Sequence, residues 1–294
     1  MIYDKDGRSL SDAFDLTGSL DVAYDVNGNI VFQRSGPSQQ WDYTSYTVSS
    51  FFNYPQTNLQ GFAVYGNTIA QVREGDSLKL IDLDTKTLIR SVSMNMGHGN
   101  SCQFDSVFYN PSDEFPLFYV RNDGIWIYRI TGTSSTLIKK LSFSADIVGT
   151  YVAGFGIDTI NRKLYTASYT EGDYQTRTGR MRICEFDLTD ETDNGDGTFS
   201  VGLLRSNDFD WFNRFEAVQG CDFHDGYLFI ASGYTSGNGQ NIVLISSSTL
   251  GVDYTVNPGG WQELEGCAWV NNDYLLVGQR ISTYSYKKIT FAPL

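Results

Sequence analysis

The sequence is poor in helical patterns, long apolar runs and positive charge. No window of about 11 to 18 residues has convincing helical periodicity, and no apolar run approaches the roughly 20 residues that a membrane-spanning helix requires. Lys and Arg number 21 against 34 Asp and Glu, so the formal net charge is −13, and no basic stripe compensates for it. These absences argue against a helical fold, against membrane insertion and against nucleic acid as a partner.

Cysteine is scarce as well. The four cysteines, Cys102, Cys184, Cys221 and Cys267, lie in apolar strand-like runs, and none forms a Cys-x-x-Cys pair. We therefore expect buried reduced thiols rather than disulfides or a metal set. The first six residues lack the pattern of a secretory signal, which favours folding in a reducing cytoplasm. A cell-surface or secreted location would require a signal that has been trimmed.

Sequence motifs of the common enzyme classes are missing. The chain contains no Ser nucleophile elbow, P-loop, Gly-x-Gly-x-x-Gly or His-Glu-x-x-His. An acidic Gly-rich stretch at residues 190–197 does not have the spacing of an EF-hand. We therefore expect no cofactor, no resident metal and no catalytic residue.

The residues that are abundant favour β-structure. Tyr and Phe number 19 each and Gly 29, against only 6 Pro, and long stretches alternate apolar with polar residues. A chain of 294 residues can bury a substantial core. The predicted class is all-β.

Five segments align without gaps and establish a repeat. They are Gln60-Gly61-Phe62-Ala63-Val64, Asn100-Ser101-Cys102-Gln103-Phe104, Ala153-Gly154-Phe155-Gly156-Ile157, Gln219-Gly220-Cys221-Asp222-Phe223 and Glu265-Gly266-Cys267-Ala268-Trp269. In a strand, alternate residues share a face, so one face is large and apolar while the other is mainly Gly, Ala and Ser, with Gln103 and Asp222 as exceptions. This pattern is typical of the innermost strand of a propeller blade, where small residues crowd toward the axis.

Each segment is followed by further strand-like runs, and hairpin turns such as Gly66-Asn67 separate them. The last repeat lacks a fourth strand of its own. Residues 41–48 precede the first repeat as a fourth strand precedes each later one, so we expect them to complete the last blade and close the ring. The predicted fold is a five-bladed β-propeller over residues 37–294.

Residues 1–36 are left as an N-terminal arm. The unit aromatic-Asp-x-x-Gly occurs at residues 3–7, 14–18 and 24–28, and it predicts small hairpins. Two interpretations stay open. The arm is either a lead-in that packs along the propeller or an attachment segment through which the chain forms a homo-oligomer.

Several stretches resemble tail-associated and structural proteins from phages and prophages of gut bacteria. They are residues 24–29, 60–65, 97–104 and 113–116. The resemblance implies tail-fibre assembly or host-surface attachment, with a bacterial surface glycan or other virion proteins as partner. It also implies a location in the virion after synthesis in the bacterial cytoplasm.

The ligand site is expected on the face where the loops lead into the inner strands, because these loops surround the mouth of the axial channel. They supply aromatic rings edged with carboxylates and amides, which suit the C–H face and the hydroxyls of a sugar. Buried structural roles are the alternative for each residue. The predicted ligand-binding residues are Tyr54, Gln60, His98, Asn100, Trp211, Glu216, Gln219, Trp261 and Glu265.

Binding without chemistry is favoured, and an enzyme is the main competitor. Glycoside hydrolases occur among five-bladed propellers and need two carboxyl groups about 5–9.5 Å apart, for which Glu216, Glu265 and Asp222 are available. Those families resemble one another in inner-strand Asp residues, whereas four of the five matching positions here hold Ala63, Gln103, Gly156 and Ala268. We therefore predict a non-enzymatic protein that recognises a bacterial surface glycan. The alternatives are a glycoside hydrolase-like enzyme and a virion structural scaffold.

Overall fold

The computed structural model describes residues 22–24, 30–33, 40–56, 58–75, 77–170, 179–234, 239–257, 259–280 and 284–294. The chain forms two compact units, one of Met1–Trp41 with Pro293–Leu294 and one of Asp42–Ala292. In the first unit, β1 (Val22–Tyr24) pairs antiparallel with β2 (Ile30–Gln33). The turns predicted for the arm lie outside the described residues.

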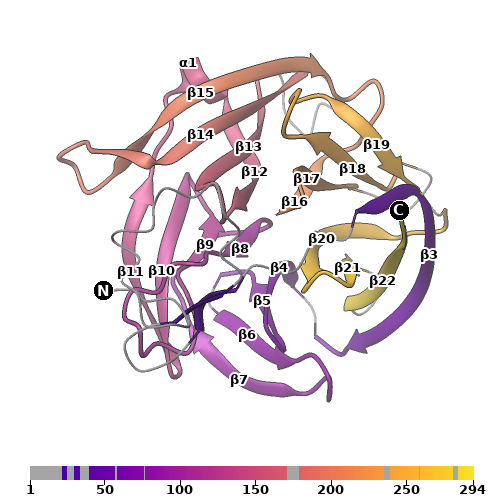
Figure 1. The fold of residues 1–294 in the computed structure, drawn as a ribbon, viewed down its shortest axis with the longest axis horizontal. Coiled ribbons are helices and arrows are strands. Elements are labelled where there is room, and N and C mark those ends of the chain that lie inside the picture. Colours follow the sequence, from indigo (N-terminus) through magenta and orange to yellow (C-terminus); the bar gives the residue numbers. More distant parts are fainter. Residues whose placement is uncertain are drawn as a thin grey trace. The chain divides into compact units, whose positions relative to one another are not determined.

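The second unit is built from antiparallel runs of four strands (Figure 1). The runs are β4 (Leu59–Tyr65), β5 (Thr68–Arg73), β6 (Ser77–Asp82) and β7 (Leu88–Ser93); β8 (Cys102–Phe104), β9 (Phe118–Arg121), β10 (Ile125–Thr131) and β11 (Ser134–Leu141); β12 (Tyr151–Asp158), β13 (Lys163–Tyr169), β14 (Arg180–Asp193) and β15 (Phe199–Asp210); β16 (Val218–His224), β17 (Tyr227–Ser232), β18 (Asn241–Ser246) and β19 (Val252–Val256); and β20 (Glu263–Val270), β21 (Tyr274–Arg280), β22 (Tyr284–Pro293) and β3 (Trp41–Tyr54). One short helix, α1 (Ala145–Val148), precedes β12.

The N-terminal strand β3 pairs with β22, the last strand of the chain. This confirms that residues 41–48 supply the fourth strand of the last run. The first three runs also touch through single parallel pairs, Ser134 with Ser93 and Leu141 with Phe199. Their strands therefore count as one 12-stranded sheet.

The first strand of each run lies toward the middle of the second unit in Figure 1, and the fourth lies toward its outside. We call β4, β8, β12, β16 and β20 the inner strands. Each inner strand contacts the next one along the chain, and β20 contacts β4. The five aligned segments of the sequence thus come together in the middle of this unit.

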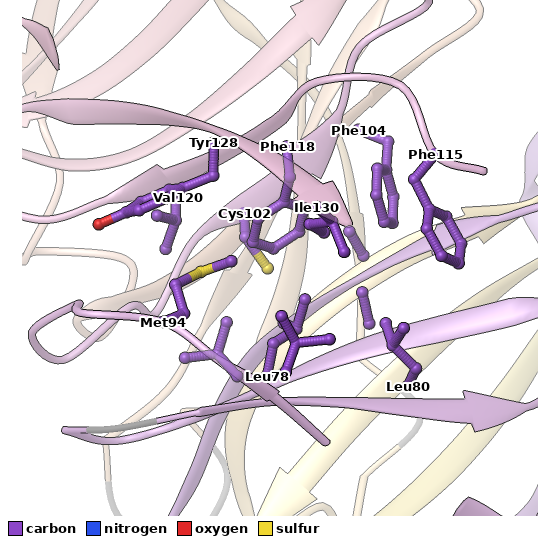
Figure 2. Packing of buried hydrophobic residues seen from close by; sticks show 14 of the residues in the cluster. Leu78, Leu80, Met94, Cys102, Phe104, Phe115, Phe118, Val120, Tyr128 and Ile130 are labelled. Atoms are coloured by element: carbon purple, nitrogen blue, oxygen red, sulfur yellow. The ribbon is translucent and has the colours of Figure 1, made fainter. Parts of the chain in front are cut away.

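The core lies between the runs and is formed by the large apolar side chains of the repeat. Figure 2 shows one of these layers, where Leu78 and Leu80 of the first run face Cys102, Phe104 and side chains from later strands of the second run. All are buried, and a fully buried Leu or Phe contributes roughly 1.5–3 kcal/mol to stability. Repetition of such layers explains why apolar residues recur in every segment.

Small residues are required where the inner strands approach one another. A Cβ added at Gly61 would lie 2.0 Å from the backbone oxygen of Asn100, and one at Gly220 would lie 2.8 Å from the Cα of Gly266. Real Cβ atoms do not approach backbone this closely, so glycine is needed at both positions. Small residues therefore occupy the places where neighbouring inner strands meet.

The two polar exceptions on this face join neighbouring inner strands. The Gln103 amide donates to the Ile157 carbonyl (3.0 Å) and accepts from its N–H (2.6 Å), which links β8 to β12. One oxygen of Asp222 accepts from the N–H of Trp269 (2.6 Å) and links β16 to β20. Burial raises the pKa of Asp222 to about 7. Asp222 was a candidate catalytic carboxyl in the sequence, but in the fold its carboxyl group links two strands.

All four cysteines are buried and free, as predicted. In the part of the chain that the structure describes, no helix has the length and apolarity needed to cross a membrane. Neither finding points to a functional site, whereas the polar residues at the starts of the inner strands do.

Candidate functional site

Four of the inner strands carry an irregularity in pairing near their start. The register shifts lie between Leu59 and Phe62, Val152 and Gly154, Val218 and Gly220, and Leu264 and Gly266. A β-bulge leaves a residue without a partner across the ladder and turns its side chain away from the regular alternation. The residues bypassed in this way are Gln60 with Gly61, Ala153, Gln219 and Glu265. Three polar predicted site residues are therefore placed by equivalent bulges.

The irregularity in β4 is held by side chains from other strands. The Gln71 amide donates to the carbonyls of Gln60 (2.6 Å) and Gly61 (3.0 Å), and the Tyr284 hydroxyl donates to that of Gln60 (3.0 Å). The Gln71 amide oxygen in turn accepts from the Tyr286 hydroxyl. Backbone groups that the bulge removes from the ladder are thereby satisfied without water. The start of β4 is consequently fixed in this geometry.

A chain of amides links three inner-strand starts. Asn100 Nδ2 donates to Gln219 Oε1 at 2.7 Å, and Gln219 Nε2 donates to Glu263 Oε1 at 3.5 Å. When Glu263 is ionised its carboxylate only accepts, and in that state it fixes the orientation of both amides. The chain leaves Asn100 Oδ1 buried without a hydrogen-bond partner among the described residues, and Gln60 Oε1 is in the same position. Both are acceptors, and buried acceptors are normally satisfied.

Charged groups surround this amide chain. Glu74 Oε1 lies 2.8 Å from His98 Nδ1, and Arg280 Nη1 lies 3.9 Å from Glu265 Oε1. The Glu74, His98 and Arg280 side chains are about half exposed, whereas the Glu265 side chain is 2% exposed. The site thus grades from a charged rim to a buried polar floor. We call this set the inner-strand site: Gln60, Glu74, His98, Asn100, Gln219, Glu263, Glu265 and Arg280.

The two carboxyl groups of β20 have different environments. Burial raises the pKa of Glu265 to about 8, and the neighbouring carboxylates of Glu263 and Glu74 add to this rise while Arg280 opposes it. The pKa of the less buried Glu263 is also raised by burial, and Arg280 and His98 counteract that rise. Glu265 is therefore mainly protonated at neutral pH. A protonated carboxyl can both donate a hydrogen bond and deliver a proton.

Five predicted site residues belong to this cluster: Gln60, His98, Asn100, Gln219 and Glu265. Glu263 was expected beside these residues, whereas Glu74 and Arg280 were not predicted. Glu74 comes from the turn between the second and third strands of the first run, which lies on the same side as the loops leading into the inner strands. Its position in that turn is the feature of the sequence from which Glu74 could have been predicted.

Three of the aromatic rings that were predicted to be exposed are buried. Trp211 is fully buried, packs on Phe215 with ring centroids 4.7 Å apart, and donates its indole N–H to the carbonyl of Glu216. Trp261 and Tyr54 are buried as well. These rings are large apolar groups that complete the core where loops leave the strands, so they offer no open face to a sugar.

Glu216 is placed by its loop rather than by an inner strand. A Cβ added at Gly239 would lie 2.8 Å from Glu216 Cγ, so its side chain packs against the segment that follows β17. The carboxyl group most closely associated with Glu265 is therefore that of Glu263. No three His, Cys, Asp or Glu side chains within the described ranges gather closely enough to hold a metal ion.

Comparison with known proteins supports the fold. No family model matches the sequence, and the search of curated proteins finds no match. A glutaminyl cyclase of Myxococcus xanthus is similar in structure, with a TM-score of 0.51 and 11% identity, over 84% of this chain and 98% of that one. The PQQ-bound aldose sugar dehydrogenase of Streptomyces coelicolor is similar with a TM-score of 0.51 and 9% identity, over 85% and 100%. Identities this low show an all-β, propeller-like fold and nothing about function.

Proposed function

We propose that the second unit is a closed five-bladed β-propeller. The five runs are its blades, and β3 completes the blade that β20 begins. Contacts from each inner strand to the next, including β20 to β4, support a ring around one axis. The inner-strand site then surrounds one end of that axis, which is a common place for ligands in such folds.

We further propose that the chain is an enzyme that carries out acid–base chemistry on a small polar substrate at this site. Glu265 acts as the general acid and Glu263 as its partner base. The observation that carries this assignment is the buried Glu265 carboxyl, which stays protonated near neutral pH beside a more exposed carboxyl on the same strand. Paired carboxyls that differ in burial are typical of acid–base catalysis, glycoside cleavage included.

The buried Glu265 carboxyl favours this assignment over the binding protein expected from the sequence. Both similar structures are enzymes by name, one a glutaminyl cyclase and the other an aldose sugar dehydrogenase. Neither is named as a phage protein. A glycoside hydrolase-like activity, the enzyme alternative expected from the sequence, likewise uses a pair of carboxyls. The phage-tail role, the virion location and a surface-glycan or virion partner stay predictions from resemblance.

A panel of oligosaccharides and polysaccharides tests the enzyme. Product release is expected, and Glu265→Gln should reduce it about 100-fold or more because the proton donor is lost. The matched control is Glu191→Gln, which changes an acid on β14 that pairs with Lys139 outside the site. In the wild type, kcat/KM should fall as the pH rises through about 8, where Glu265 loses its proton. Full activity in Glu265→Gln would exclude the assignment.

Binding without catalysis is the second candidate. It is favoured by the unpartnered acceptors Asn100 Oδ1 and Gln60 Oε1, which call for a ligand but not for a reaction. A glycan array separates the two candidates. Retention of a glycan with no product from the same glycan would support the binder, and Asn100→Ala should then weaken retention.

A further inference from the structure

We propose that the inner-strand site binds its ligand through a primary ammonium group. This inference rests on the proposed function for the location of the site, and it adds the chemical class of the ligand. The ammonium would occupy the buried floor, where it meets Asn100 Oδ1 and the carboxyls of Glu263 and Glu265. The rest of the ligand would extend toward the half-exposed rim.

The unused hydrogen-bonding capacity of the floor consists of acceptors. Asn100 Oδ1 has no partner, and its amide nitrogen is already committed to Gln219. Gln219 is committed in turn, because its oxygen accepts from Asn100 and its nitrogen donates to Glu263. The floor therefore requires donors from the ligand. An ammonium group supplies three, whereas a hydroxyl group supplies one.

Gln60 adds a second unpartnered acceptor, and its backbone neighbours that of Glu265. Gly61 and Gly266 approach so closely that a Cβ on Gly266 would lie 3.4 Å from the Cα of Gly61. Gln60 and Glu265, the residues before these glycines, thus start from neighbouring backbone. Gln60 is 1% exposed, and its Oε1 has no partner in the described part of the chain.

The charges around the floor favour a cation. Glu263 and Glu265 lie at the floor and Glu74 at its rim, and Arg280 is the basic side chain beside Glu265. His98 is held by Glu74, and the 3.9 Å between Arg280 and Glu265 is too long for a hydrogen bond. Arg280 is half exposed and does not neutralise Glu265, which stays protonated instead. A ligand ammonium would supply the missing charge and drive the proton off Glu265.

This exchange gives a binding signature that a neutral sugar lacks. At about pH 6.5 Glu265 holds its proton, so arrival of an ammonium releases up to about one proton to the buffer. A neutral polyol can bind the protonated carboxyl and releases none. Proton release therefore reports on the ligand class directly.

Titration calorimetry with D-glucosamine and D-glucose tests the inference, because these two sugars differ in one amine. Measurements at about pH 6.5 in phosphate and in an amine-free buffer of higher ionisation enthalpy give the protons released. We expect glucosamine to bind about tenfold tighter than glucose, the effect of one charge-assisted hydrogen bond, and to release a proton. Ethanolamine against ethylene glycol repeats the comparison without the sugar ring.

Variants test which residues cause the preference for the amine and the release of the proton. Asn100→Ala should weaken glucosamine about tenfold and leave glucose unchanged, while Asn100→Asp, which keeps an acceptor, should restore binding. Glu265→Gln should abolish proton release, and the control Glu191→Gln should keep it. If Asn100→Ala does not fold, the proton count of the wild type still decides. Equal affinity for both sugars, or glucosamine binding without proton release, would overturn the inference.

The outcome is separable from that of the proposed enzyme. If neutral saccharides are cleaved and glucose binds as tightly as glucosamine, the acid–base site stands and the ammonium inference fails. If glucosamine binds with proton release but no substrate is turned over, the ligand class stands and the catalytic assignment fails.

Discussion

At the scale of single residues, Asp222 shows how the same side chain can look catalytic in the sequence and be structural in the fold. It is buried, it accepts from the backbone N–H groups of Phe223 and Trp269, and it joins β16 to β20. Its raised pKa follows from burial, which those two hydrogen bonds only partly offset. A perturbed pKa alone therefore does not mark a catalytic group.

Asp222 should make stability depend on pH. Its pKa is about 7 in the folded protein against 3.8 in its ordinary state, so the folded state binds the extra proton between these values. The titration of Asp222 alone should consequently lower the free energy of unfolding by roughly 2–3 kcal/mol from pH 5 to pH 8. Glu265, raised from 4.5 to about 8, acts in the same direction. Urea unfolding at both pH values measures the fall.

The variant Asp222→Asn measures how much of this pH dependence comes from Asp222. Asparagine keeps an acceptor for the Trp269 N–H but does not titrate, so the fall between pH 5 and pH 8 should shrink in the variant. Glu265→Gln provides the parallel measurement for the second group. An unchanged slope in Asp222→Asn would show that Asp222 keeps an ordinary pKa.

Trp211 is predicted to matter for stability rather than for binding. Its ring is fully buried among the apolar residues of the third and fourth runs, so Trp211→Ala should lower the free energy of unfolding by about 3–5 kcal/mol. Trp211→Phe keeps most of the volume and should cost clearly less. Chemical denaturation of both variants measures the difference. A stable Trp211→Ala variant with weakened sugar binding would restore the exposed-ring hypothesis.

At the scale of elements, the bulges explain why the site was only partly predictable. The repeat placed Gln60, Asn100, Gln219 and Glu265 in equivalent positions, because aligned segments occupy aligned strands. Period-two alternation assumes a regular strand, and it carries no sign that one residue is bypassed in the ladder. The direction of these side chains could therefore not be derived from the sequence.

Contacts between distant segments were the other part of the site that the sequence could not predict. Asn100 and Gln219 are separated by 119 positions, and their hydrogen bond exists only once the inner strands come together. Glu74 reaches His98 from a turn that contains no motif. The strands, in contrast, were predictable, because each carries its own alternation and its own turn residues.

The irregular start of β4 should depend on Gln71. Replacing it by Met keeps the length of the side chain but leaves the carbonyls of Gln60 and Gly61 without their amide donor. We expect a loss of about 1–3 kcal/mol in the free energy of unfolding, together with weaker ligand binding at the inner-strand site. Thermal melting and calorimetry measure the two effects. The control Gln56→Met, outside strand β4, should change neither.

At the scale of the whole second unit, β3 joins the beginning of the chain to its end. Tyr43 of β3 is buried against Tyr227 and Phe291, with ring centroids 5.1 Å apart in both pairs. Its neighbours belong to the fourth and fifth runs, so this strand fills the seam between them. Without β3, the edge of β22 would expose unpaired backbone and an apolar face to other chains.

Two truncations test this closure. Removing residues 1–40 leaves β3 intact, so the melting temperature of the second unit should be retained. Removing residues 1–54 deletes β3 and its Tyr43 contacts, and the chain should then melt at a lower temperature and aggregate through the opened edge. Differential scanning calorimetry and light scattering compare the two. A synthetic peptide of residues 41–54 added in trans should rescue the shorter chain, because it restores the pairing partner of β22. If the shorter chain melts like the longer one, β3 does not stabilise the run that it completes.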